Sequence, residues 1–211
     1  MQPKDVYDFH AWFNGKFAGV LGVRASTFYQ ALMLAVARNA KTIVETGTLR
    51  IAGNWGGDGQ STRLLAEFAQ RYDCRLWTCD LDPAAIAVAR EETAPFAARI
   101  EYVVGDSVAF LQQFPQPIDL LLLDSKDFDP DDPDPSQDHA VREAQAALPR
   151  LHMQSIVLID DCGLKHGGKG GKVIPFLLGQ GWQAVGLNYQ VLLTHTFDSM
   201  GKTVPHTLFA E

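Results

Sequence analysis

The segment Val44–Thr62, VETGTLRIAGNWGGDGQST, has the pattern of a short strand, a glycine-rich turn and the start of a helix. The pattern predicts the strand over Thr42–Thr46 and the helix near Ser61–Tyr72, where apolar residues recur at helical spacing. A strand ending in a carboxylate, a glycine turn and a helix N-terminus are together typical of a nucleotide-type binding crevice. Gly57 and Gly59 provide G-x-G without the third glycine of the dinucleotide fingerprint, so a glycine loop without a ligand is the competing interpretation.

Outside this stretch, short apolar runs alternate with amphipathic segments, which predicts an α/β protein with a mostly parallel sheet. Further strands are expected at Arg75–Cys79, Ile100–Val104, Ile118–Leu123, Ser155–Ile159, Trp182–Leu187 and Gln190–Thr194. Only Asn188 and Tyr189 separate the last two strands, so these are expected to form an antiparallel hairpin. Further helices are expected to begin at Asp82-Pro83 and to cover Val108–Phe114, His139–Leu151 and Val173–Leu178.

Length and composition indicate a globular protein of about one domain, with 211 residues, 46% hydrophobic and 20% charged. Residues 1–40 precede the alternating pattern and are rich in aromatic side chains. We expect these residues to form helices that serve as a lid or a dimer contact. Residues 41–211 are expected to form one ligand-binding domain.

Three features predict a cytoplasmic protein without a membrane partner. The first residues, MQPKDVYDFH, lack the basic-then-apolar order of a signal peptide. The most apolar early stretch, Ala25–Ala37, lies between two arginines and is too short to span a bilayer. The sequence has 3 cysteines and no CxxC motif, as expected for a protein of a reducing compartment.

The net charge of -7 comes from 25 acidic and 18 basic side chains. Six aspartates lie in the segment 127–138, DFDPDDPDPSQD, which is expected to be an irregular loop; the rest of the chain is close to neutral. No basic patch occurs beyond Lys165–Lys172, so nucleic acid is not expected as a partner. The expected partner is a small-molecule substrate, with a homodimer as a further possibility.

Acidic residues recur at the ends of the predicted strands. Asp80 ends the second strand, Asp106 follows the third and Asp124 ends the fourth. Ligands of open α/β sheets bind at this carboxyl edge. A carboxylate after the second strand suits the two hydroxyls of a ribose, and the pair Asp106-Ser107 suits the edge of an adenine. Glu45 at the first turn suits a ligand that carries a cationic amine.

With these residues, the region Thr42–Thr194 resembles the class I S-adenosylmethionine-dependent methyltransferases. The resemblance implies a Rossmann-like three-layer sandwich: a mostly parallel seven-stranded sheet with an antiparallel C-terminal hairpin strand, beside the N-terminal helices. It implies S-adenosylmethionine as cofactor, bound by Glu45, Thr46, Gly47, Gly59, Ser61, Asp80, Asp106, Ser107 and Asp124. Leu49–Trp55 looks inserted between the family's glycines, which leaves open whether Gly53, Gly56 or Gly57 contacts the cofactor.

Three carboxylates, Asp124, Asp160 and Asp161, are expected to converge at the ends of the fourth and fifth strands. Three anions at one edge are costly unless a cation or proton neutralises them, and such oxygen ligands suit Mg²⁺. The pattern LLLLD…LIDDCG…GGKGGK resembles the metal-dependent small-molecule O-methyltransferases of the macrocin and novobiocin sugar type, and more distantly the catechol type. This resemblance implies Mg²⁺ bound by the three aspartates; the alternative is that Asp161 caps the following turn without a metal.

The candidate catalytic residues are Asp124, Lys126 and His166. Lys126 stands where the resembled enzymes have an aspartate as base, and burial would have to lower its pKa for this role. His166 lies in Gly163–Gly170, which nearly matches the phosphate-binding GxxxxGK[ST] pattern but lacks its last hydroxyl. We interpret this segment as a loop beside the substrate that offers Lys165 or His166.

The favoured hypothesis is Mg²⁺-assisted methyl transfer from S-adenosylmethionine to a hydroxyl oxygen of a small molecule. Metal-free N- or O-methylation is the first alternative. A nicotinamide-dependent oxidoreductase is another, although the sequence offers no evident nicotinamide-binding half. The last alternative is a non-catalytic cofactor-binding module, for which the acidic segment 127–138 would be an interaction surface.

Overall fold

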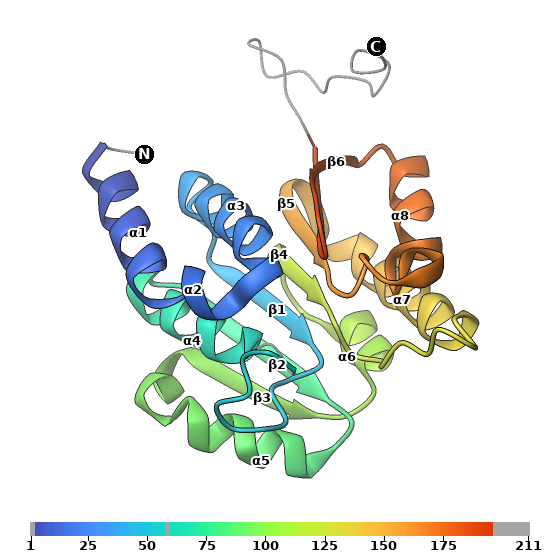
Figure 1. Cartoon of the computed structure of the whole chain (residues 1–211), viewed down its shortest axis with the longest axis horizontal. Coiled ribbons are helices and arrows are strands. Elements are labelled where there is room, and N and C mark those ends of the chain that lie inside the picture. The colour runs from blue at the N-terminus through green and yellow to red at the C-terminus, as the bar shows by residue number, and fades with distance from the viewer. Residues whose placement is uncertain (1–2, 58–59, 196–211) are drawn as a thin grey trace.

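A sheet of seven strands forms the centre of the part of the chain that the computed structural model describes, residues 3–57 and 60–195 (Figure 1). The strands are β1 Thr42–Thr46, β2 Arg75–Asp80, β3 Ile100–Val104, β4 Ile118–Leu123, β5 Leu151–Ile159, β6 Gln183–Leu187 and β7 Val191–Thr194. Their order is β3-β2-β1-β4-β5-β7-β6, and β7 runs antiparallel to both of its neighbours. The predicted fold class and the C-terminal hairpin are thereby confirmed.

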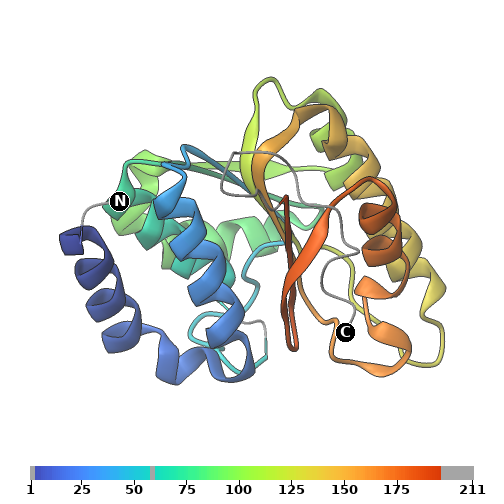
Figure 2. The ribbon, with the colours of Figure 1, turned by 90° about the horizontal axis from the view of Figure 1, so that it is seen from above.

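Helices cover both faces of the sheet, as the view from above shows (Figure 2). One layer contains α1 Pro3–Lys16, α2 Ala18–Leu21, α3 Ala25–Ala37 and α4 Ser61–Tyr72. The other contains α6 Ser107–Gln113, α7 Asp134–Ala147 and α8 Gly170–Gly179. The remaining helix, α5 Pro83–Glu92, follows β2 and contacts β2, β3 and α4. Each helix that follows a parallel strand returns the chain to the start of the next, as parallel pairing requires.

The central strand β4 is apolar because both of its faces are buried. Leu120 and Leu122 pack with α1, α3 and α4, whereas Leu121 and Leu123 pack with α6, α7 and α8. All four side chains are at most 1% exposed. Burying a leucine contributes about 1.5–3 kcal/mol, so this strand ties the two helical layers together.

The N-terminal segment is part of the main core. Phe9, Trp12 and Phe13 of α1 are buried, and Trp12 contacts the ring of Phe68 on α4. This aromatic layer joins the apolar residues of β1, β2 and β4 in one continuous cluster. A role of residues 1–40 as a lid or a dimer contact remains a prediction.

Helical turns continue over Ala18–Ala37, a run of 20 residues. By length and apolar composition alone, this run could cross a membrane. The apolar stretch Ala25–Ala37 forms α3, and the run is longer because α2 and a 3₁₀ turn at Gly22–Arg24 precede α3. In the structure Phe28 and Leu32 of this run are buried against the sheet.

The acidic segment 127–138 is helical in its last part, because α7 begins at Asp134. The expectation of a helix starting at His139 was therefore wrong. Pro135 lies in the first turn, where its missing N–H costs no helical hydrogen bond. Asp134 also lies in the first turn, where the helix dipole favours a negative charge.

The turn after β1 depends on Gly47. This residue has φ +81°, and a Cβ atom added to it would lie 2.5 Å from the carbonyl oxygen of Asp124. Gly53 provides a matched comparison, because it has φ +67° with nothing within 4 Å of the same added atom.

We expect Gly47→Ala to lower the free energy of unfolding more than Gly53→Ala does, as measured by urea denaturation. The positive φ alone costs an alanine about 1–2 kcal/mol, and the backbone clash at Gly47 adds about 1–3 kcal/mol more. Equal losses in the two variants would contradict the close approach of the β1 turn to Asp124.

Candidate active site

The register of the sheet brings the predicted acidic residues to one edge. Thr46 at the end of β1 is paired with Leu123 at the end of β4. The Asp124 N–H donates to the Thr46 carbonyl at 3.0 Å, and the Asp160 N–H donates to the Leu123 carbonyl at 3.1 Å. Asp80 ends β2 on the other side of β1. The carboxyl ends of four neighbouring strands therefore meet at one place.

Two cavities open at this edge and share Asp80 and Ser125 in their walls. The first, of about 190 Å³, is lined by six aspartates and three cationic side chains. The second, of about 340 Å³, is lined by the predicted adenine-contacting pair, Asp106 and Ser107. A larger cavity of about 820 Å³ lies near the starts of the strands and contains none of the predicted site residues in its wall.

Asp80 is held in a fixed orientation where the two cavities meet. Its Oδ2 accepts a hydrogen bond from the Thr48 N–H at 3.1 Å, and its Oδ1 accepts one from the Asp82 N–H at 2.9 Å. These two donors come from the turns after β1 and β2. The carboxylate that the sequence assigns to a ribose is thus positioned by backbone groups.

Glu45 lies behind the glycine turn and lines neither of these two cavities. Its side chain is 0% exposed, and its Oε2 accepts hydrogen bonds from the hydroxyls of Thr62 and Thr78 at 2.7 and 2.8 Å. Burial raises the pKa of Glu45 to about 7, although neighbouring hydroxyls oppose this shift. Because Thr62 lies in the first turn of α4 and Thr78 lies in β2, Glu45 joins β1 to both elements.

The other predicted cofactor residues differ in their positions. Gly47 lines the first cavity together with Gly57, one of the three glycines left open by the sequence. Thr46 and Ser61 are buried and line neither cavity. Gly59 lies outside the described residues.

The three candidate catalytic residues are not brought together. Asp124 lines the first cavity, and its side chain is 20% exposed. Lys126 is exposed and lines the second cavity. His166 is exposed, adopts φ +56° and lines neither.

A buried lysine lies within the acidic cluster. Lys169 directly precedes α8, and its side chain is 5% exposed. Its Nζ lies 2.5 Å from Asp124 Oδ1 and 3.0 Å from Asp161 Oδ2. Burial alone would lower the pKa of Lys169, but the two carboxylates raise it above its ordinary value. The amine is therefore a cation at neutral pH.

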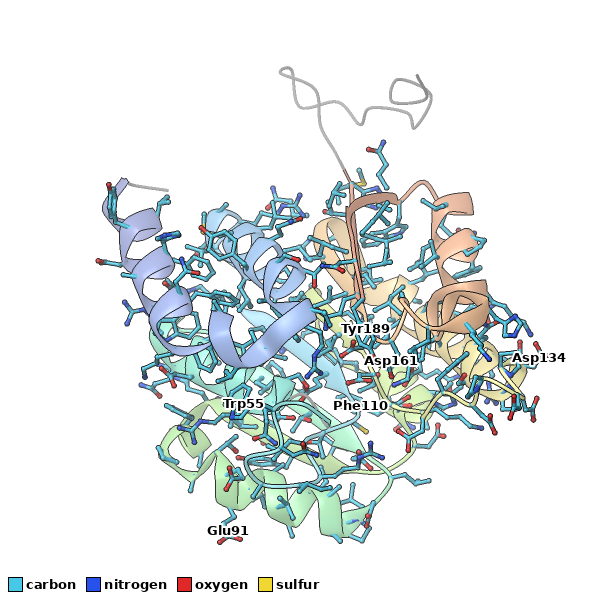
Figure 3. All side chains as sticks on the ribbon, in the orientation of Figure 1. Trp55, Glu91, Phe110, Asp134, Asp161 and Tyr189 are labelled. Atoms are coloured by element: carbon cyan, nitrogen blue, oxygen red, sulfur yellow. The ribbon has the colours of Figure 1, made fainter. Side chains whose placement is uncertain are left out.

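Both carboxylate oxygens of Asp160 and the second oxygen of Asp161 also have partners. Asp160 Oδ2 lies 3.5 Å from Arg24 Nη1, and Asp160 Oδ1 accepts a hydrogen bond from the Asp161 N–H at 2.8 Å. The Tyr189 hydroxyl donates to Asp161 Oδ1 at 2.6 Å, and Figure 3 shows the two residues beside each other. Arg24 comes from the 3₁₀ turn before α3, and Tyr189 from the β6–β7 turn.

Sequence reasoning did not assign roles to Lys169, Arg24 or Tyr189. Lys169 belongs to the glycine-rich segment interpreted as a substrate loop, but its neighbours Lys165 and His166 were favoured. The near match to a phosphate-binding lysine was the only available indication of its importance. Arg24 and Tyr189 reach the site from elements that carry no motif.

The arrangement of the three predicted metal ligands does not fit Mg²⁺. The Lys169 ammonium lies between Asp124 and Asp161, where an ion bridging these carboxylates would have to bind. Asp160 is engaged by Arg24 and by backbone N–H. Within residues 3–57 and 60–195, no three His, Cys, Asp or Glu side chains form a group suited to a metal. The donor set, as arranged, fits an ammonium group.

The sequence pattern of one protein family, described as "Methyltransferase domain", matches residues 55–162. The match begins in the glycine-rich turn and ends just after Asp160 and Asp161, so it includes β2, β4 and β5 with their terminal aspartates. None of the curated proteins matches the chain.

Several solved structures share the fold. The S-adenosylhomocysteine-bound methyltransferase PaMTH1 of Podospora anserina is 16% identical, with 92% of this chain and 88% of that chain covered and a TM-score of 0.59. The O-methyltransferase of Bacillus cereus, also in complex with S-adenosylhomocysteine, is 16% identical, with coverages of 92% and 90% and a TM-score of 0.58. The O-methyltransferase NovP is 14% identical, with coverages of 85% and 80% and a TM-score of 0.56.

The raised pKa of Glu45 makes stability depend on pH. Between the ordinary pKa of 4.5 and the folded-state value of about 7, the folded protein binds more protons than the unfolded chain. Stability from this group is therefore lost as the pH rises through that window, by up to about 1.4 kcal/mol per pH unit. We expect Glu45→Gln, which cannot ionise, to remove this part of the slope in denaturant titrations between pH 5 and pH 8.

Glu101→Gln is the matched control, because Glu101 is an exposed residue of β3. Its pH profile should follow that of the wild type. A Glu45→Gln profile as steep as the wild-type one would show that Glu45 ionises normally in the folded protein.

Proposed function

The chain belongs to the methyltransferase domain family, and we propose that it transfers the methyl group of S-adenosylmethionine to a hydroxyl oxygen of a small molecule. The observation that carries this proposal is the position of Asp80 between the two cavities. A ribose bound to Asp80 would direct the adenine toward Asp106 and Ser107. The methionine portion and the sulfonium would then lie in the cavity that contains Asp124.

The charge of the first cavity supports this choice of cofactor. Its walls contain six aspartates and only three cationic side chains. S-adenosylmethionine carries a sulfonium and an ammonium group, which a negative cavity attracts. A nicotinamide dinucleotide would instead place its anionic pyrophosphate near these carboxylates, and this disfavours the oxidoreductase alternative.

The choice of an oxygen acceptor is supported by similar proteins. The Bacillus cereus protein and NovP both bear the name O-methyltransferase, and the Bacillus cereus and Podospora anserina proteins were solved with S-adenosylhomocysteine.

The reaction requires alignment and removal of one proton. The acceptor oxygen forms a bond to the methyl carbon, the carbon–sulfur bond breaks, and its electron pair stays on sulfur. The hydroxyl proton passes to a base, for which we propose Asp124, because it alone among the three candidate catalytic residues lines the first cavity. Holding the two reactants in line supplies most of the rate enhancement in such a transfer.

Lys126 and His166 are less suited to this role than Asp124. Lys126 borders the cavity proposed for the adenine, and His166 borders neither cavity. Magnesium assistance, which the sequence predicts, would require the ion pairs of Lys169 with Asp124 and Asp161 to open. We therefore favour the metal-free form of the reaction.

The cofactor is tested by thermal unfolding with S-adenosylhomocysteine, NAD⁺, NADP⁺ and ATP in parallel. A ligand at 100 times its dissociation constant adds about 2.7 kcal/mol to stability. We expect only S-adenosylhomocysteine to raise the melting temperature. Stabilisation by NAD⁺ without stabilisation by S-adenosylhomocysteine would overturn the proposed function.

The role of Asp80 is tested with Asp80→Ala, which should weaken S-adenosylhomocysteine binding about 10- to 100-fold in calorimetry, the loss expected for charge-assisted hydrogen bonds. Asp119→Ala is the matched control. Asp119 also accepts hydrogen bonds from two backbone N–H groups, those of Lys41 and Thr42, at the starts of the strands. The Asp119→Ala variant should lower the free energy of unfolding while leaving the affinity for S-adenosylhomocysteine unchanged. Equal affinities in the two variants would contradict the position assigned to the ribose.

A further inference from the structure

We infer that the Lys169 ammonium takes the place of a divalent metal ion between Asp124 and Asp161, so that this protein binds no metal at its acidic cluster. The inference rests on the proposed function, because it concerns the cavity in which the methyl acceptor would bind. Lys169 thus neutralises the carboxylates that a magnesium ion would otherwise neutralise.

The first support is the position of the amine. Nζ of Lys169 lies 2.5 Å from Asp124 Oδ1, 3.0 Å from Asp161 Oδ2 and 3.4 Å from the Asp124 carbonyl oxygen. A magnesium ion bound to the same oxygens would lie about 2.0–2.1 Å from each of them. The ammonium and the ion would therefore occupy the same volume, and only one of them can be present.

The second support is that the backbone fixes the lysine in this place. Gly168 has φ +53°, and a Cβ atom added to it would lie 1.6 Å from the Asp161 carbonyl oxygen. The loop before Lys169 therefore lies directly against Asp161, one of the two aspartates that pair with Lys169. Gln137, which is 5% exposed, donates hydrogen bonds to the carbonyl oxygens of His166 and Gly168 at 3.0 and 2.9 Å. This loop is anchored from α7 as well.

The third support is the balance of charge. The three carboxylates of Asp124, Asp160 and Asp161 face two buried cations, Lys169 and Arg24. Tyr189 donates a further hydrogen bond to Asp161. Side chains of this protein therefore already supply the counter-charges of the cluster. A divalent ion in place of Lys169 would exchange one positive charge for two beside the positively charged methyl donor.

The test measures Mn²⁺ binding, because Mn²⁺ takes the same kind of oxygen ligands as Mg²⁺. Bound ion is determined from the loss of the free-ion paramagnetic resonance signal, without any substrate or turnover. The proteins are the wild type, K169M, K169R and K172M. Lys172 is the matched control, because it also bridges two carboxylates, Asp134 Oδ1 at 2.8 Å and Asp138 Oδ1 at 2.6 Å, but on the surface.

We expect the wild type, K169R and K172M to bind no stoichiometric Mn²⁺, since each retains a cation between Asp124 and Asp161. K169M should bind one equivalent, about ten-fold or more tightly than the wild type, because removal of the ammonium exposes two carboxylates. Its melting temperature should fall without Mn²⁺ and recover with it. Stoichiometric binding by the wild type, or a folded K169M without any gain, would overturn the inference.

Should K169M fail to fold, the wild type and K169R still decide the question, since a site built for metal would bind Mn²⁺ in the wild type and lose it in K169R. S-adenosylhomocysteine binding is measured in the same samples with and without EDTA. Wild-type protein that binds both S-adenosylhomocysteine and one Mn²⁺ would contradict the inference about Lys169 but not the proposed function. Protein that binds no S-adenosylhomocysteine would contradict the proposed function.

Discussion

Carboxylates at the ends of neighbouring parallel strands must be neutralised, and much of the structure around the site provides the groups that do so. The sheet register places Asp124 and Asp160 side by side at β4 and β5, where both are largely shielded from water. Unpaired charges in such a place would cost several kcal/mol each. Lys169 and Arg24 supply the counter-charges, and they come from opposite helical layers of the molecule.

This constraint also explains why the loop after β5 is so rich in glycine. The backbone before Lys169 passes so close to the Asp161 carbonyl that no side chain fits at Gly168. This close approach places the Lys169 amine beside the carboxylates. Gln137 then holds the loop by its carbonyl oxygens. A segment that resembles a phosphate-binding loop in sequence thereby serves to position one cation.

The central strands β1 and β4 were predictable from the sequence because they are buried. The bounds of β1, β3 and β4 match those expected. An apolar run such as Ile118–Leu123 is typical of a strand in a sheet covered on both faces. The start of α7 was missed because the Asp and Pro composition of 127–138 outweighed the favourable positions of Asp134 and Pro135 in a first helical turn.

The site was predictable only where it lies on the strands. Asp80 and Asp124 follow buried runs, so their convergence at one edge follows from parallel pairing alone. Lys169 is 45 positions from Asp124 along the chain, and its pairing is a result of the tertiary fold. Glu45 was placed correctly on the first strand, but which way its side chain pointed depended on the hydroxyls of α4 and β2.

Arg24 gives the N-terminal helices a further significance. It pairs with Asp160 and donates a hydrogen bond to the Trp55 carbonyl in the glycine-rich turn, while Leu21 and Phe28 pack in the main core. A shortened chain that began at Lys41 would keep every strand, yet Asp160 would lose its counter-ion. Residues on both sides of position 40 therefore share one continuous core.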